Sequence, residues 1–227
     1  MHNCLITGSP FASLRENAGL SRCPFPPLRY GRTRGTNPTA SRRLSPASYL
    51  MKITLDHNCI IHLENATDVG KSVQAIVGSV GNECFVVNIG ASEMRAKGVR
   101  PDRYERFEEL LGQTGLSHLP RLNPMMIFDV TFWDRCVWAD DSTMKLAADI
   151  EDALFGEAEE IDIASVGLDS PEGGRWLNRL CDVHGMWCHI QSGNDVFLTT
   201  DGNFSKETKR PRLLALGARR ICHPKEL

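Results

Sequence analysis

Residues 182–201 read DVHGMWCHIQSGNDVFLTTD, and this segment is the strongest indication of the fold. Its first half completes a helix that the spacing predicts over residues 171–192, with Gly193 as its stop. The apolar run VFLT at 196–199 then predicts a short buried strand, and Asp201 stands just beyond its end. A helix that leads directly into a buried strand is typical of an α/β protein.

The rest of the chain after residue 50 repeats this alternation. Further strands are predicted at 51–55, 84–87, 125–130 and 218–222, and further helices at 58–63, 66–80, 92–111 with a break at Pro101, 140–155 and 205–216. Because strands alternate with helices, we predict a three-layer α/β/α domain over residues 51–227 with a mostly parallel central sheet. Residues 112–170 add a helical enlargement in mid-chain, in which the sequence suggests no chemistry.

The composition is that of a globular protein with no membrane partner. The 227 residues are 41% apolar and 24% charged, and no stretch approaches the roughly 18 consecutive apolar residues of a membrane span. The eight cysteines are scattered and form no CxxC pair. In a chain this long they favour reduced, buried thiols in a cytoplasmic protein over a disulfide framework.

Charge is distributed unevenly along the chain. Residues 1–50 contain seven Arg, no Lys and one Glu, so their net charge of +6 leaves −8 for the remainder of a chain whose total is −2. The same fifty residues hold six of the twelve prolines and have the composition of a segment that buries little. We expect a disordered basic leader, or an extension upstream of a true start at Met51; an organelle transit peptide is the alternative.

Four acidic residues stand where parallel strands end or on the helices beside them. Asp56 follows the first strand, Asp201 follows the strand at 196–199, and Glu93 and Asp182 lie on adjoining helices. Reactive groups gather beyond the carboxyl ends of the strands in open α/β sheets. Carboxylates that converge there repel each other unless a cation neutralises them, and Mg²⁺ or Mn²⁺ prefers such oxygen ligands.

Two polar neighbours are candidates to support these acids, and each acid also has a simpler explanation. Asn58 could hydrogen-bond a ligand carboxylate or a bound water, and Thr199 could orient Asp201. Asp56 could instead only cap a helix, and Asp201 could only serve an Asp-Gly turn. Glu93 could be a solvated charge on a helix face. Among the four acids, only Asp182 lies between apolar residues of a predicted helix, and a charged side chain there is the hardest to explain by structure alone.

At these residues the chain resembles the PIN-domain ribonucleases, the family that includes VapC-like toxins of bacterial toxin–antitoxin pairs. The segment ITLDHNCIIHLE at 53–64 is similar to the family's strand–Asp–x–Asn/Ser–helix opening. Residues 182–201 resemble its late signature of Asp, helix, Gly-x-Asp, strand and Thr-x-Asp, and NIGASEMRAKG at 88–98 resembles its helical Glu segment. The resemblance covers residues 51–95 and 175–227.

The resemblance implies a PIN-like fold and a metal-dependent endoribonuclease that hydrolyses RNA with a metal-activated water. Carried over by position, the catalytic and metal-binding acids are Asp56, Glu93, Asp182 and Asp201, with Asn58 and Thr199 in support. Asp195, in the Gly-x-Asp step, is expected to be structural. Many relatives have a histidine one residue later than His184, and the stretch at 112–170 is longer than in compact relatives.

RNA is the expected substrate, and an antitoxin and a second copy of the chain are partners that the resemblance alone implies. Basic residues near the acids are candidate phosphate contacts, namely Arg95, Lys206, Lys209 and Arg210. A solvated helix face is the simpler explanation for each of them. Trp176 and Trp187 are expected in the core, whereas Trp133 and Trp138 could face a partner.

Two other functions remain open from the sequence. The first is a catalytically silent PIN-like module that binds RNA or a protein. The second is a phosphatase of the HAD type with Asp56 as nucleophile, which Asn58 disfavours because that family usually has an acid at this position.

Overall fold

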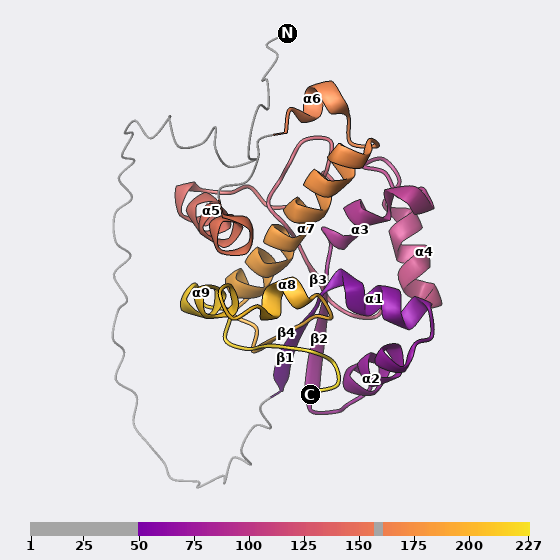
Figure 1. Cartoon of the computed structure of the whole chain (residues 1–227). Helices are drawn as coiled ribbons and strands as arrows, with labels where there is room; N and C mark the ends of the chain where they lie inside the picture. Colours follow the sequence, from indigo (N-terminus) through magenta and orange to yellow (C-terminus); the bar gives the residue numbers. More distant parts are fainter. Residues whose placement is uncertain (1–49, 157–160) are drawn as a thin grey trace, which may run out of the picture.

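A computed structural model describes residues 50–156 and 161–227 (Figure 1). The expected leader therefore lies outside the described residues. In the described part of the chain, five parallel strands form one sheet in the order β3-β2-β1-β4-β5. The strands are β1 (Met51–Leu55), β2 (Asn82–Val87), β3 (Arg121–Leu122), β4 (Val196–Leu198) and β5 (Ile221–Cys222).

The helices lie on both faces of this sheet, which confirms the predicted three-layer α/β/α class. They are α1 (His57–Glu64), α2 (Asp68–Val77), α3 (Gly90–Glu93), the 3₁₀ turn η2 (Met94–Lys97), α4 (Glu105–Gln113), α5 (Asp141–Phe155), α6 (Ile163–Val166), α7 (Pro171–Gln191), α8 (Gly202–Ser205) and α9 (Arg210–Ala215). Across the described ranges, none of these helices combines the length and the apolar character that crossing a bilayer requires.

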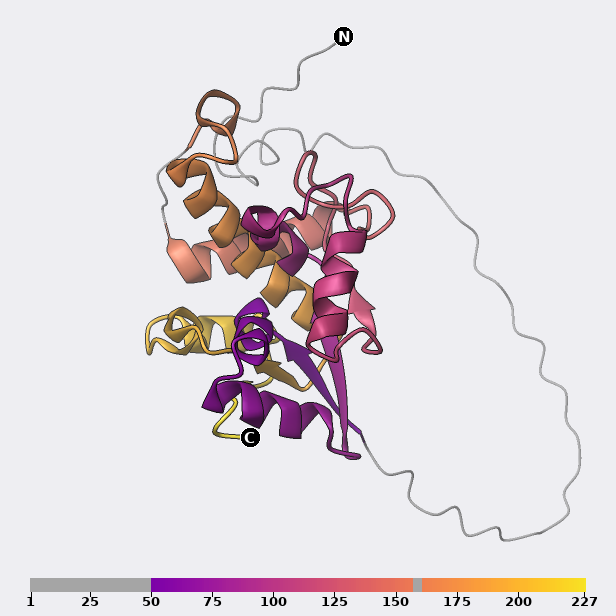
Figure 2. The same ribbon diagram turned by 90° about the vertical axis from the view of Figure 1, so that its right-hand side faces the viewer.

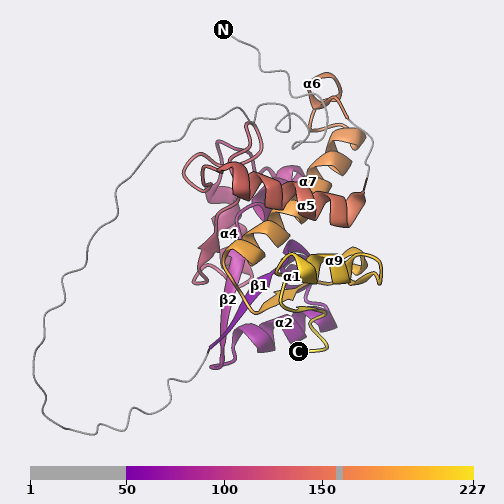
Figure 3. The same cartoon turned by 90° about the vertical axis from the view of Figure 1, so that its left-hand side faces the viewer.

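Alternate residues of the central strands enter two different cores. Phe197 of β4 packs in a cluster with residues of α5, α7 and α9, and α5 packs against α7 (Figures 1 and 3). Its neighbours Val196 and Leu198 pack in the other cluster, with residues of α1, α2 and α4. Because successive side chains of a strand point to opposite faces, this division buries the sheet on both sides. Trp176 and Trp187 belong to the first cluster, as expected.

Local sequence features determine where helix α7 begins. Ser170 accepts a hydrogen bond from the Gly173 N–H and so caps the helix, while Pro171 occupies its first turn. A Cβ at Gly173 would come within 2.1 Å of the Gly167 carbonyl oxygen, so this turn packs closely against the preceding loop. These contacts fix the start of a 21-residue helix that carries Asp182 in its middle.

The predicted strand at 125–130 is wrong. The third strand is β3, which precedes it, and Met125 makes only an isolated bridge to Val137. Pro124 cannot donate to a ladder, and Met125 and Val130 are buried by packing instead. The segment from β3 to α5 is therefore mostly an irregular connection, so α5, α6 and the last two residues of α4 are the only helical parts of the predicted enlargement among the described residues.

The helical segments predicted at 92–111 and 205–216 are both interrupted, and the break near Pro101 in the first confirms the prediction. The helix predicted at 92–111 is split into α3, η2 and α4, with Gly98 at φ 86° and Pro101 in the break. The helix predicted at 205–216 is split into α8 and α9, and a proline opens the second. A positive φ and a missing proline N–H each interrupt the helical hydrogen-bond ladder.

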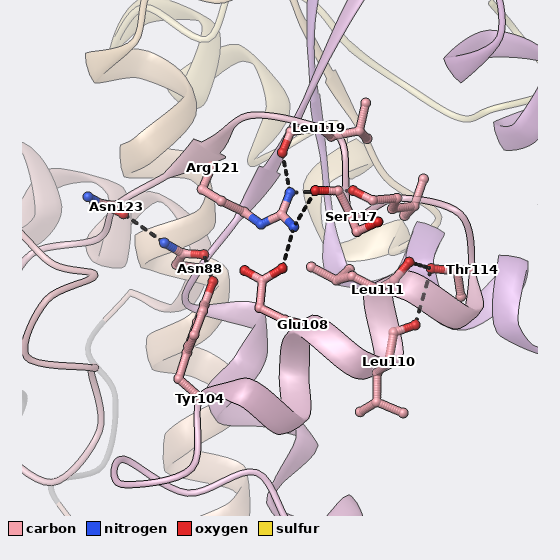
Figure 4. Close-up of polar contacts among 11 residues, drawn as sticks. Asn88, Tyr104, Glu108, Leu110, Leu111, Thr114, Ser117, Leu119, Arg121 and Asn123 are labelled. Atoms are coloured by element: carbon pink, nitrogen blue, oxygen red, sulfur yellow. Dashed lines mark hydrogen bonds and ion pairs between the residues drawn. The ribbon is translucent and has the colours of Figure 1, made fainter.

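Polar contacts anchor the sheet edge at β3 (Figure 4). The Arg121 guanidinium donates to Glu108 of α4 at 2.8 Å. Asn88, just beyond β2, donates to Asn123 Oδ1 at 2.7 Å and accepts from the Tyr104 hydroxyl at 2.5 Å. These bonds join the end of β2, the start of α4 and the connection that follows β3.

Candidate functional site

The four predicted acids come from four elements at the carboxyl end of the sheet. Asp56 directly follows β1 and Asp201 lies just beyond β4, the strand paired with β1. Glu93 is the last residue of α3, which contacts α7, the helix of Asp182. The carboxylates are close enough for the charges of Asp56 and Asp201 to raise the pKa values of both Glu93 and Asp182.

Asp56 is buried and held by three donors. Its Oδ1 accepts from the His57 N–H at 2.8 Å, and its Oδ2 accepts from the Thr199 hydroxyl at 2.6 Å and from Asn58 Nδ2 at 3.2 Å. Burial raises its pKa to about 6, although these three hydrogen bonds oppose the rise. Asp56 therefore caps α1, which is the simpler of its two predicted roles. Its carboxylate is also close enough to Asp201 for their charges to interact.

Thr199 connects two of the acids in a way that the sequence did not specify. Its hydroxyl donates to Asp56 and accepts from the Asp201 N–H at 3.0 Å. Thr199 therefore holds Asp201 through its backbone N–H, as the predicted orienting role requires, and the carboxylate that its hydroxyl contacts is that of Asp56. Asp201 accepts from the Asn203 N–H at 2.8 Å and caps α8, so it does not stand in a simple Asp-Gly turn.

Glu93 and Asp182 carry strongly shifted pKa values. Burial, followed by the charges of Asp56 and Asp182, raises the pKa of Glu93 well above its usual range. The side chain of Glu93 is only 21% exposed, so it is not a solvated charge on a helix face. Burial, followed by the charges of Asp56 and Asp201, raises the pKa of Asp182 to about 8, while Lys209 lowers it.

His57 is a neighbour of the acids that the sequence argument missed. Its Nε2 lies 3.9 Å from Glu93 Oε2. Burial lowers the pKa of His57 to about 4, so the ring is neutral near pH 7. A Cβ at Gly90 would come within 2.8 Å of His57 Nδ1, and only glycine lets α3 pack this closely on α1. In the sequence, only its position next to Asp56 could have indicated that His57 lies near the acids.

The four basic residues predicted to contact phosphate differ in whether other groups of the protein hold their side chains. Arg95 forms an ion pair with Asp169 at 3.1 Å. The Lys209 ammonium donates to Asn203 Oδ1 at 2.5 Å and to the Leu154 carbonyl. Lys206 and Arg210 are exposed. The last two are therefore the better candidates for contact with a ligand from solution.

Asp195 and His184 have surroundings that suit structural roles. Asp195 accepts from the Lys52 N–H at 2.9 Å and from Arg219 at 2.7 Å, so it joins β1, β4 and the approach to β5. This agrees with the structural role expected for it. His184 is fully buried on α7, and burial lowers its pKa to about 3, so the ring is neutral.

The carboxyl oxygens have the chemistry that Mg²⁺ and Mn²⁺ prefer, but their spacing is loose. In residues 50–156 and 161–227, no group of three or more His, Cys, Asp or Glu side chains is close enough to hold one metal ion. The four acids interact through their charges without meeting at a single point. The donor type thus fits a hard divalent cation.

Comparison of the chain with protein-family models, with curated proteins and with solved structures finds no match in any of the three.

Replacing Thr199 by Val is expected to raise the pKa of Asp56 above its value of about 6. Valine has the same shape but cannot donate to the carboxylate, and one hydrogen bond to a charged group contributes about 1.5 kcal/mol, or about one pKa unit. The measurement is an NMR titration of the Asp56 carboxyl carbon. Thr199→Ser keeps the hydroxyl and should restore the wild-type value; equal titrations of all three proteins would contradict the role of the hydroxyl.

Proposed function

We propose that this protein is a metal-dependent endoribonuclease of the PIN-domain type, acting in the cytoplasm on RNA phosphodiester bonds. The observation that carries the proposal is that four carboxylates, from the ends of β1 and β4 and from α3 and α7, lie at one edge of the sheet, and that the pKa values of three of them, Asp56, Glu93 and Asp182, are raised. A cluster of this kind is costly to charge and is found preferentially at functional sites.

A divalent cation would relieve this cost. Asp56, Glu93, Asp182 and Asp201 would hold Mg²⁺ or Mn²⁺, since all four offer carboxylate oxygens. When bound, such an ion lowers the pKa of an attacking water and stabilises the leaving oxygen. The charge repulsion among the acids is the physical reason to expect affinity for a cation and none for an anion.

Neighbouring side chains and backbone groups position the acids, and basic side chains would contact the substrate. Thr199 and Asn58 fix the Asp56 carboxylate, and the Asn203 N–H fixes that of Asp201. Lys206 and Arg210 would contact RNA phosphates.

A cysteine nucleophile does not suit this site. The thiol on α7 next to Asp182, Cys181, is buried, and burial together with the nearby acids raises its pKa well above the usual range. The pKa of the Cys59 thiol is raised in the same way. Because the thiolate is the reactive form, these groups are inert, and a water is the better nucleophile for the proposed hydrolysis.

A catalytically silent PIN-like module that binds RNA or a protein is the second candidate. Such a module needs no ion position shared by the acids, and among the described residues no three of them form one. An antitoxin and a second copy of the chain are further proposed partners of either candidate, by resemblance to VapC-like toxins alone.

Cleavage of total RNA by the full chain tests the function. We expect cutting with Mg²⁺ or Mn²⁺, none with EDTA, and new ends that carry 5′-phosphate and 3′-hydroxyl groups. Calorimetric titration with Mn²⁺, compared between the wild type and Asp56→Asn, measures binding separately from cleavage. Mn²⁺ binding without cleavage would point to a narrow RNA target, whereas neither binding nor cleavage would favour the silent module. Cutting that persists in EDTA would contradict the proposal.

A further inference from the structure

Four exposed, large apolar side chains lie on the connection between β3 and α5. The exposed fractions are 67% for Phe128, 77% for Trp133, 39% for Val137 and 76% for Trp138. The two tryptophan rings meet edge to face, with centroids 6.4 Å apart. We call these four residues the aromatic surface. Two exposed tryptophans in contact, with two more exposed apolar side chains on the same connection, mark an interaction site more often than scattered single residues do.

The segment that carries the aromatic surface is tied down. Val137 donates its N–H to the Pro124 carbonyl and accepts from the Met126 N–H, both at 2.9 Å. The Thr131 hydroxyl bonds to both backbone groups of Ile127. Figure 2 shows this connection looping beside α3 and the start of α4. The side chains are therefore exposed on an ordered support, which reduces the entropy lost on binding.

Contacts with neighbouring elements hold the same connection at its start and near its middle. Asn123 accepts from Asn88 (Figure 4), and the Val130 carbonyl accepts from the Ser92 hydroxyl at 2.8 Å. Asp129 adopts φ 61°, a left-handed conformation that few side chains tolerate, directly after Phe128. The backbone around the aromatic surface is thus fixed by specific bonds.

The stretch of chain that carries the aromatic surface has a negative net charge. Residues 126–141 contain four exposed acids and one base, so the net charge of this stretch is −3; the acids are Asp129, Asp134, Asp140 and Asp141. The one base, Arg135, lies over the Tyr104 ring at 5.1 Å and pairs with Asp134. An RNA strand would meet like charges here, whereas a positively charged partner would meet opposite ones.

We propose that the aromatic surface binds a basic segment of another protein, in which apolar side chains stand among Lys and Arg. Tryptophan is enriched among the residues that contribute most to protein–protein binding, and the surrounding acids complement a basic partner. A second copy fits less well, because a two-fold contact through this surface would bring two negative surfaces together. The proposal does not depend on nuclease activity.

Two matched peptides test the proposal on the full chain. One is an amphipathic peptide of Leu and Lys, and the other has the same pattern with Glu in place of Lys. We expect the Lys peptide to bind and to shift tryptophan fluorescence to shorter wavelengths. Its affinity should fall at least about tenfold in the double variant Trp133→Ser/Trp138→Ser, and also in Asp129→Asn/Asp134→Asn. Val80→Ser, which removes an apolar side chain 94% exposed elsewhere, should leave the affinity unchanged.

Several outcomes would overturn the proposal. Equal affinity of the Lys peptide for the wild type and both double variants would place its binding elsewhere. Equal binding of the Glu peptide would remove the role of charge. Displacement of the Lys peptide by oligouridylate would assign the surface to RNA, and a doubled mass in sedimentation that the tryptophan variant reverses would assign it to a second copy. Because the altered side chains are exposed, thermal unfolding should confirm that the variants fold.

Discussion

Asp182→Asn is expected to lower metal-dependent RNA cleavage by at least about 100-fold. Asn keeps the shape of the side chain but removes the negative charge through which Asp182 would hold a divalent cation. A bound cation contributes several kcal/mol to stabilisation of the transition state, and losing about 2.7 kcal/mol already costs a factor of 100. The measurement is the rate of cleavage of one RNA at saturating Mg²⁺ or Mn²⁺.

Glu207→Gln is the matched control for this prediction. Glu207 is an exposed acid a few residues beyond Asp201, so its loss changes the net charge by the same amount without touching the cluster. Its cleavage rate should equal that of the wild type. If Asp182→Asn cleaves as fast as Glu207→Gln, then Asp182 is not part of the active site. Partial recovery of the Asp182→Asn rate at high Mn²⁺ concentration would show that the loss is one of cation affinity.

The positions of Asp56 and Asp201 could be predicted because the sequence pattern shows where the apolar strands end. The apolar runs that form β1 and β4 end next to Asp56 and Asp201, and parallel strands bring such ends to one edge of the sheet. Asp182 stood out because a charge inside an apolar helix pattern needs an explanation. These inferences depend on local patterns that a single sequence displays.

The parts that escaped prediction depend on long-range contacts. His57 could not be placed beside Glu93 from the sequence, because their approach requires α3 to pack on α1 through Gly90. Lys209 looked like a free surface cation, but Asn203 and the end of α5 hold it. The strand β3 has two residues, too few for any periodicity, and Arg121 fixes its edge through contacts with α4.

In buffer without divalent cations, Asp182 is expected to lower the free energy of unfolding by about 2 kcal/mol as pH rises from about 6.5 to about 8, and Glu93, whose pKa is also raised, adds to this fall. Asp182 keeps its proton to about pH 8 in the folded state but loses it near pH 3.8 once unfolded. The folded state therefore binds more protons in this range, so by linkage its stability falls with pH until the folded pKa is passed. A rise of about 1.5 pH units corresponds to about 2 kcal/mol for one group.

The pH range is chosen so that the buried histidines do not obscure this slope. Burial lowers the pKa values of His57 and His189 to about 4 and that of His184 to about 3, which makes stability rise with pH only up to about 6.5. Chemical denaturation of the wild type and of Asp182→Asn at several pH values measures the difference. The variant should have the flatter slope and the higher stability at pH 8, and saturating Mn²⁺ should flatten the slope of the wild type. Parallel slopes would mean that Asp182 is ionised throughout, in which case the cluster would not repel itself enough to require a cation.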